Sequence, residues 1–336
     1  MPITPDLIWV KNRDDSSGHY LLDTVRGDDK NIRSDGTYTE SAVSGASNGI
    51  ISTIGSNSFT VKDGSGSGSN VGSTGTEDYV AWFWKAGGNK NTFNVDDVGY
   101  ASAAAAGLTG GSITPTGASV GTKQGFSIIG YTGTNSNDSV AHGLLQAPNF
   151  VIIKDRDATQ PWVVGHTSIG FTKYLWLNSQ NAEATLSTVW QDTAPTSSVF
   201  TIGATAGVNA SGDDYIAYLW HDVPGLQKFG SFTGNNSTDG PFVELGFRAK
   251  LIIYKVNQSG HNWMIFDSER DKDNPCSASL RGNLTNAEST FSALDITSTG
   301  FKFRNTDTNI NNVEIIYMAW AEAPTVDLYG GGANAR

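Results

Sequence analysis

The stretch Phe150-Val-Ile-Ile-Lys154 recurs as Leu251-Ile-Ile-Tyr-Lys255, and the Trp162-Val-Val that follows it recurs as Trp263-Met-Ile. Both recurrences lie 101 positions further along the chain. The first two stretches are short, apolar and rich in β-branched residues, as is typical of strands that are buried on both faces. A fixed offset of this length is the signature of a repeated structural unit.

A third copy of the unit lies at the N-terminus. Residues Pro5-Asp-Leu-Ile-Trp-Val-Lys-Asn-Arg13 match residues 148–156, and Asp78-Tyr-Val-Ala-Trp-Phe-Trp84 match residues 214–220. This copy lacks a counterpart of the segment Gly125–Gly133, with which the second copy begins. We therefore predict a first repeat (1–88), a connector (89–122), a second repeat (123–224), a third repeat (225–324) and a Gly-rich C-terminal tail (325–336).

The composition predicts an all-β fold. The chain of 336 residues has 39 Gly, 10 Pro and only 16% charged residues, against about 25% in an average domain. Apolar runs alternate with Gly, Asn, Ser and Asp clusters that favour turns. About six strands per 100 residues is the spacing of a β-sandwich. We predict three tandem, jelly-roll-like β-sandwich units stacked in series, the first without its leading strand.

The missing leading strand predicts an open sheet edge in the first repeat. An unpaired edge invites pairing with another chain unless it is covered. We expect either the connector, residues 89–122, or a neighbouring protomer to fill it.

Bulk properties limit the partners. The net charge is −11, which argues against nucleic-acid binding. No apolar run approaches the roughly 20 residues of a membrane helix, so we predict no membrane insertion. A single cysteine, Cys276, allows no internal disulfide, and we interpret it as a bystander rather than a nucleophile.

The sequence shows no catalytic motif, and we predict no catalytic, cofactor-binding or metal-binding residues. The five histidines have no metal-ligand spacing, and no Gly-rich stretch has the context of a phosphate-binding loop. Asp23 and Asp267 occupy matching positions in the first and third repeats. Two carboxylates that hydrolyse a glycosidic bond would not need to stand at a repeated position. Each is followed three residues later by an arginine, Arg26 or Arg270, so we interpret both as Asp–Arg pairs that fix a turn.

The tryptophans divide into two sets. Trp162 and Trp263 share a repeat position, and so do Trp84, Trp220 and Trp320, which predicts packing in the core or between repeats. The other set is not shared in this way and supplies the candidate ligand-facing aromatics. Its members are Trp82, Trp176 and Trp190.

Several of these motifs resemble the repeat found in virion and tail-fibre proteins of marine bacteriophages. The resemblance rests on residues 5–13, on Tyr79-Val-Ala-Trp-Phe-Trp-Lys-Ala-Gly-Gly88 and on Ile316-Tyr-Met-Ala-Trp-Ala-Glu-Ala-Pro324, and it covers nearly the whole chain. It implies a non-enzymatic particle component, found in the virion, with other particle proteins as partners. It supplies no catalytic residues.

The leading hypothesis is a tail fibre or tail appendage subunit, homo-oligomeric and expected to be trimeric, that contacts a glycan or protein of the host surface. One alternative is a capsid decoration or tail-assembly subunit without receptor contact. A second alternative is a carbohydrate-binding or depolymerising module.

Overall fold

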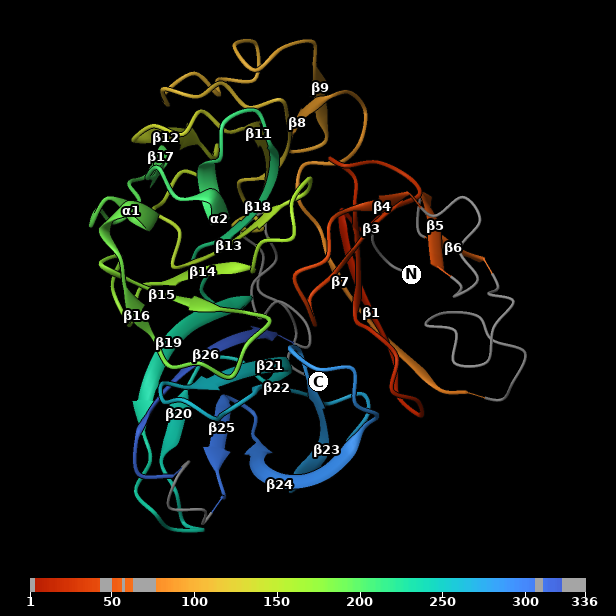
Figure 1. The fold of residues 1–336 in the computed structure, drawn as a ribbon. Coiled ribbons are helices and arrows are strands. Elements are labelled where there is room, and N and C mark those ends of the chain that lie inside the picture. Colours follow the sequence, from red (N-terminus) through yellow and green to blue (C-terminus); the bar gives the residue numbers. More distant parts are fainter. Residues whose placement is uncertain (1–3, 43–49, 56–57, 63–76, 306–310, 322–336) are drawn as a thin grey trace.

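The computed structural model describes residues 4–42, 50–55, 58–62, 77–305 and 311–321 (Figure 1). The predicted tail, residues 325–336, lies outside these residues. The described residues contain two four-residue helices, α1 (Ser187–Trp190) and α2 (Ala206–Asn209). All other regular elements among them are strands. The all-β prediction is confirmed. Neither helix is long and apolar enough to cross a membrane in the part of the chain that is described.

Three large sheets follow one another along the chain. The first has the strand order β4-β3-β2-β1-β7, the second β16-β15-β14-β13-β18-β11-β10-β8-β9 and the third β19-β26-β21-β22-β23-β24-β25-β20. Every pairing in them is antiparallel except that of β8 with β10.

The strands of the first sheet are β1 (Leu7–Asn12), β2 (Tyr20–Asp23), β3 (Lys30–Arg33), β4 (Ser41–Ala42) and β7 (Tyr79–Trp84). Those of the second are β8 (Phe93–Val95), β9 (Val98–Tyr100), β10 (Gly117–Gly121), β11 (Phe126–Thr132), β13 (Phe150–Asp155), β14 (Val163–His166), β15 (Lys173–Trp176), β16 (Ala184–Thr185) and β18 (Asp214–Trp220). Those of the third are β19 (Gln227–Thr233), β20 (Phe242–Glu244), β21 (Ala249–Val256), β22 (Trp263–Asp267), β23 (Cys276–Arg281), β24 (Ser289–Ile296), β25 (Gly300–Phe303) and β26 (Glu314–Ala321). Two further pairs are β5 (Ile50–Gly55) with β6 (Ser58–Lys62), and β12 (Asp138–Ala141) with β17 (Val199–Ile202).

The three sheets share one motif of four adjacent strands. It is β3-β2-β1-β7 in the first sheet, β15-β14-β13-β18 in the second and β23-β22-β21-β26 in the third. The sequence matches fall on equivalent strands, since residues 5–13 and 148–156 span β1 and β13. In the second and third sheets a fifth strand, β11 or β19, pairs with the last strand of the motif.

The central strands β1, β13 and β21 are buried on both faces. Successive side chains of a strand point to opposite faces. In β18, Ile216, Tyr218 and Trp220 point to a core that all three sheets share, whereas Tyr215 and Leu219 point to an outer core formed by the second repeat and the connector. In the second repeat, β12, β17, α1 and α2 contribute side chains to that outer core. In the third repeat, β20, β24 and β25 contribute side chains to a separate outer core. The first sheet has a smaller outer cluster, to which β5 and β6 contribute.

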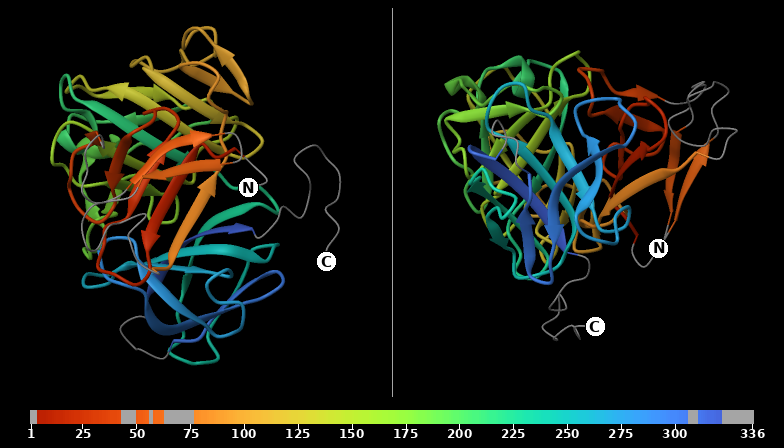
Figure 2. Two further views of the ribbon diagram at one scale, coloured as in Figure 1. Left: turned by 90° about the vertical axis from the view of Figure 1, so that its right-hand side faces the viewer. Right: turned by 90° about the horizontal axis from the view of Figure 1, so that it is seen from below.

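The repeats do not extend in a line, which corrects the expectation of units stacked in series. Their shared faces meet around a common centre, with the first sheet in red to orange, the second running from orange (β8 and β9) through yellow to green, and the third in teal to blue (Figures 1 and 2). Trp84, Trp220 and Trp320, one from each repeat, contact one another with ring centroids 5.5 to 6.2 Å apart. The predicted packing role of this shared tryptophan position is confirmed.

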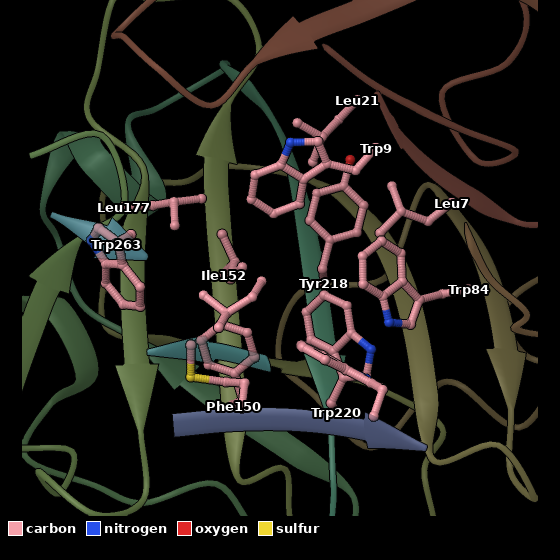
Figure 3. Close-up of a pocket in the computed structure, with 13 residues that line it drawn as sticks. Leu7, Trp9, Leu21, Trp84, Phe150, Ile152, Leu177, Tyr218, Trp220 and Trp263 are labelled. Carbon is pink, nitrogen blue, oxygen red and sulfur yellow. The ribbon is translucent and has the colours of Figure 1, made fainter. Parts of the chain in front are cut away.

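The centre is filled with apolar side chains (Figure 3). A cavity of about 10 Å³ remains between them, lined by side chains such as Leu7, Phe150 and Ile253. One water molecule requires about this volume together with polar partners, so the centre has no room for a ligand. It therefore acts as a hydrophobic core common to the three repeats.

Hydrogen bonds connect the repeats in a cyclic order. The indole Nε1 of Trp162, in the second repeat, donates to the Arg33 carbonyl of the first at 2.8 Å. The equivalent Trp263 of the third repeat donates to the Trp176 carbonyl of the second at 2.9 Å. In the first repeat His19 takes this position, and its ring lies beside the backbone of Arg281 in the third. Each repeat thus contacts the next, and the third contacts the first.

Charged side chains repeat this cyclic order further from the centre. Arg156 of the second repeat binds Glu40 of the first through two hydrogen bonds of 3.0 Å. Arg13 of the first repeat binds Glu288 of the third through bonds of 2.9 and 3.0 Å. Between the third and second repeats, Asn257 occupies the position equivalent to Arg156, and its side-chain amide donates a hydrogen bond to Glu183 at 2.6 Å.

The connector does not fill the open edge of the first sheet, which corrects one of the two expectations for it. Its strands β8, β9 and β10 belong to the second sheet, where β10 pairs with β11. Among the described residues, β7 pairs with β1 and no strand pairs with its other edge.

Buried histidines make stability depend on pH. Burial lowers the pKa of His142 and His166 to about 4, from an ordinary value near 6.5. The folded state therefore keeps these rings neutral, whereas the unfolded chain binds protons below pH 6.5. This contribution to stability is present above pH 6.5 and is lost as the pH falls toward 4.

We expect the free energy of unfolding to decrease by about 1 to 2 kcal/mol for each such histidine between pH 7 and pH 5. Urea titrations at the two pH values measure the decrease. A His166→Gln variant should show a smaller decrease, whereas His261→Gln, at a less buried position, should not. Equal decreases in all three proteins would contradict the assignment.

Candidate functional site

Two of the three candidate ligand-facing tryptophans are buried, which corrects their predicted role. Trp190, in α1, is 1% exposed and packs edge-on against Phe171 in the outer core of the second repeat. Trp82, in β7, is 7% exposed, and its Nε1 donates to Asp267 at 3.1 Å. Each lacks a counterpart at the matching repeat position because it fills a contact that differs between repeats, not because it faces a ligand.

Trp176, the third candidate, is half-buried at the end of β15 and contacts Tyr174, with ring centroids 4.6 Å apart. The short helix α2 approaches it closely, since a side chain at Gly207 would meet both Val163 and Trp176. The second layer of the second repeat therefore lies over this ring.

The first repeat has an open pocket at the corresponding place. Arg33 of β3 and Tyr20 of β2 pair in the same register as Trp176 and Val163 do in the second sheet. The second layer that packs over Trp176 has no counterpart at this point among the described residues. A pocket of about 300 Å³ results, which we call the outer pocket. Its lining residues are Tyr20, Asn31, Arg33, Tyr38, Thr39, Ser41 and Thr159.

Arg33 organises the outer pocket. Its guanidinium lies 4.3 Å from the ring centroid of Tyr38 and 5.8 Å from that of Tyr20, within the range of cation–π contacts. It also pairs with Asp35 at 2.5 Å. Burial raises the pKa of the Tyr20 hydroxyl, which keeps that group protonated at neutral pH. Tyr38 is 50% exposed, so its ring is open to solvent.

This lining suits the recognition of a polar, uncharged molecule. Hydroxyl and amide side chains supply both hydrogen-bond donors and acceptors, and an exposed tyrosine ring supplies an apolar face. The positive charge of Arg33 is already paired with Asp35, so the pocket offers an anion little unpaired charge. The volume lies at the lower limit of typical small-molecule sites.

Cys276, His142 and His166 do not line the outer pocket. Burial raises the pKa of the Cys276 thiol to about 12, which makes it a poor nucleophile. His142 and His166 are buried in the second repeat. No group of three or more His, Cys, Asp or Glu side chains is placed to hold a metal ion within the described residues.

The matched aspartates fix turns, as predicted. Asp23 accepts hydrogen bonds from the amides of Val25 and Arg26 at 3.0 and 2.9 Å and pairs with the Arg26 guanidinium. Asp267 accepts bonds from the amides of residues 269 and 270 at 3.1 and 2.9 Å and pairs with Arg270.

The outer pocket was not predicted from the sequence, because its signal is a tyrosine rather than a tryptophan without a counterpart. Tyr20 stands where the other repeats have Val163 and Met264, both of which contribute to an outer core. A polar residue at a position that is otherwise apolar indicates that the second layer is absent there.

Comparison with known families places the chain in one of them. Residues 1–324 match the model described as a domain of unknown function, DUF7483, so the chain belongs to that family. No curated protein and no solved structure matches the chain.

Proposed function

We propose that this member of the DUF7483 family is a non-enzymatic structural protein of a bacteriophage particle, a tail fibre or tail appendage subunit that contacts the host surface. The resemblance of the repeat sequences to virion and tail-fibre proteins supports the particle assignment. The outer pocket is the observation that carries the host contact, because it lies open on a chain whose repeats are otherwise packed together.

A surface saccharide is the host ligand that best fits the outer pocket. A sugar ring presents an apolar face that stacks on a tyrosine, and hydroxyl groups that bond to side chains such as Thr39, Ser41 and Thr159. Because Asp35 pairs with Arg33, we expect neutral saccharides to bind better than acidic ones.

We expect Tyr38→Ala to weaken binding to host cells about tenfold, which corresponds to about 1.4 kcal/mol. The substitution removes the exposed ring of the pocket and leaves the sheet intact. The rate of adsorption of particles that carry the variant measures the effect. Phe242→Ala is the matched control, since that ring is 49% exposed on the third repeat. Equal adsorption of both variants and the unmodified particle would contradict a role of the pocket.

A purely architectural role, as a capsid decoration or tail-assembly subunit, is the second candidate. The packed centre and the cyclic contacts favour it, because they make a rigid body that needs no ligand. Particles that lack the protein separate the two functions. If they assemble but adsorb slowly, the host-contact proposal is supported. If particles without the protein adsorb normally, the architectural role is supported. The same holds if particles without the protein fail to assemble while particles with Tyr38→Ala adsorb normally.

A further inference from the structure

One lysine recurs at the same place in all three repeats. Lys11 in β1, Lys154 in β13 and Lys255 in β21 are each the second-last residue of the strand. The sequence matches between the repeats align the three with one another. All three are fully buried, although lysine is among the residue types least often found inside a protein. A buried lysine at this position is therefore a property of the repeat itself.

The three lysines close one end of the shared core. Alternate side chains of a strand lie on one face, so Lys11 points the same way as Leu7 and Trp9, which belong to that core. The other two lysines follow the same alternation. Each lysine is paired with an apolar residue of the shared core in the neighbouring strand. These residues are Val80, Ile216 and Ile316. They lie at the end of the core away from Trp84, Trp220 and Trp320.

Main-chain carbonyls hold the three ammonium groups. Each Nζ donates to the carbonyl of the next residue and to a second carbonyl in the turn that follows the strand. The distance to the second carbonyl is 3.0 Å for Lys11, 3.3 Å for Lys154 and 3.1 Å for Lys255. The accepting residues are Asn12 and Asp15, Asp155 and Ala158, and Val256 and Gln258. In the described part of the chain, none of the three lysines forms an ion pair.

The surroundings compensate little of the buried charge. Burial lowers the pKa of each ammonium group to about 8, from an ordinary value of 10.5. Burial alone acts on Lys255, and the carboxylate of the adjacent Asp155 opposes it only in part at Lys154. More charged groups face Lys11, together with a neutral imidazole. These are Asp14, Asp15, Asp35, Glu288 of the third repeat and the ring of His19.

The carbonyl arrangement also suits a neutral amine. An ammonium group has three N–H donors, whereas a neutral amine has two, which is the number of carbonyls that each Nζ contacts. Loss of the proton therefore removes a buried charge and keeps both hydrogen bonds. Between about pH 8 and 10.5 the folded protein has released protons that the unfolded chain still binds, so stability rises with pH in this range.

We propose that Lys11, Lys154 and Lys255 form a pH-sensitive device at one end of the shared core, which holds the three repeats together more firmly in mildly alkaline than in neutral surroundings. The buried histidines His142 and His166 act in the same direction at lower pH. The contacts between the repeats should therefore weaken in steps as the pH falls. The device does not depend on a host ligand, because all three side chains lie inside the protein.

The pH dependence of unfolding tests the device. Each lysine should lower the equilibrium constant of unfolding about tenfold between pH 7 and pH 9, because pH 9 lies about one unit above its pKa in the folded protein. Urea titrations at the two pH values measure the change. Lys255→Met should reduce the change about tenfold, whereas Lys272→Met, at an exposed position of the same repeat, should not.

Two other effects are separated by this comparison. Ionisation of the Cys276 thiol in the unfolded chain acts in the opposite direction, but it is common to all three proteins. Loss of the hydrogen bonds to the carbonyls of Val256 and Gln258 lowers stability equally at both pH values. If Lys255→Met and the unmodified protein show the same dependence on pH, the lysine has only this structural role and the proposal is overturned.

Titration of the folded protein gives a second readout. With ¹³C at the lysine Cε atoms, three resonances should titrate with midpoints near pH 8. Lys255→Met should lack one of them, and Lys272→Met should retain all three. The absence of any lysine midpoint below about pH 9.5 would overturn the proposal, even if Lys255→Met fails to fold.

Discussion

Replacement of Trp220 by alanine is expected to lower the free energy of unfolding by about 3 to 5 kcal/mol, the usual loss for a buried tryptophan. Its ring is 3% exposed and contacts Trp84 and Trp320 from the other two repeats. It also stacks on Phe126 and Phe150 within its own repeat, at 4.5 and 5.4 Å. The substitution therefore opens a cavity where all three repeats meet.

The expected change extends beyond one repeat. Because the contacts close a ring, the unmodified protein should unfold in one transition in urea, followed by fluorescence and by circular dichroism. Trp220→Ala should shift the whole transition to lower urea, and Trp220→Phe should shift it less. Phe242→Ala, at an exposed position, should change stability by less than about 0.5 kcal/mol. Separate transitions, of which only one moves in Trp220→Ala, would contradict a common core.

The repeat pattern predicted the strands but not the ring. Phe150–Lys154 and Leu251–Lys255 fall within β13 and β21, because a strand that is buried on both faces requires an apolar run that is visible in the sequence. The contacts between repeats lack such a signal. One repeat position approaches the neighbouring repeat in all three copies and is occupied by His19, Trp162 and Trp263. A histidine and a tryptophan are not recognisable as equivalent residues from the sequence.

The candidate site shows the same limit. Whether an aromatic ring is open to solvent depends on what packs over it, and that layer comes from distant parts of the chain. Trp176 and Arg33 pair in the same register of their sheets. The second layer lies over Trp176, whereas in the described part of the chain a pocket lies beside Arg33. The residues at these two positions do not indicate the layer above them, so the tryptophans without counterparts did not predict the outer pocket.

Within the residues that the structure describes, the first repeat has neither a second layer over Arg33 nor a strand that pairs with the outer edge of β7. Its sheet has the same central strands as the others, which the shared core requires. The outer pocket and the open edge of β7 are therefore compatible with a stable centre, since neither removes a side chain from it. The first repeat is for this reason the part of the chain where the proposed host contact lies.

Replacement of Arg26 by methionine is the second change with a large expected effect. Arg26 and Asp23 form an ion pair with both side chains fully buried. The guanidinium also donates to the carbonyls of Leu21 and Lys30 at 3.0 and 2.9 Å. Tyr218, from the second repeat, donates to the same Asp23 carboxylate at 2.6 Å. Arg26→Met would leave a carboxylate buried without its counter-charge, so we expect a loss of about 3 to 5 kcal/mol of stability.

The second repeat supplies the control for this change. At the positions of Asp23 and Arg26 it has His166 and Ile169, both buried without an ion pair. The double variant Asp23→His with Arg26→Ile copies that solution into the first repeat and removes both charges together. It should therefore be more stable than Arg26→Met alone, because the cost arises from the unpaired charge rather than from the lost pair. Urea titrations at pH 7.5, where a buried histidine is neutral, measure both variants. A loss below about 1 kcal/mol in Arg26→Met, or a double variant less stable than the single one, would show that the ion pair does not hold this turn against the second repeat.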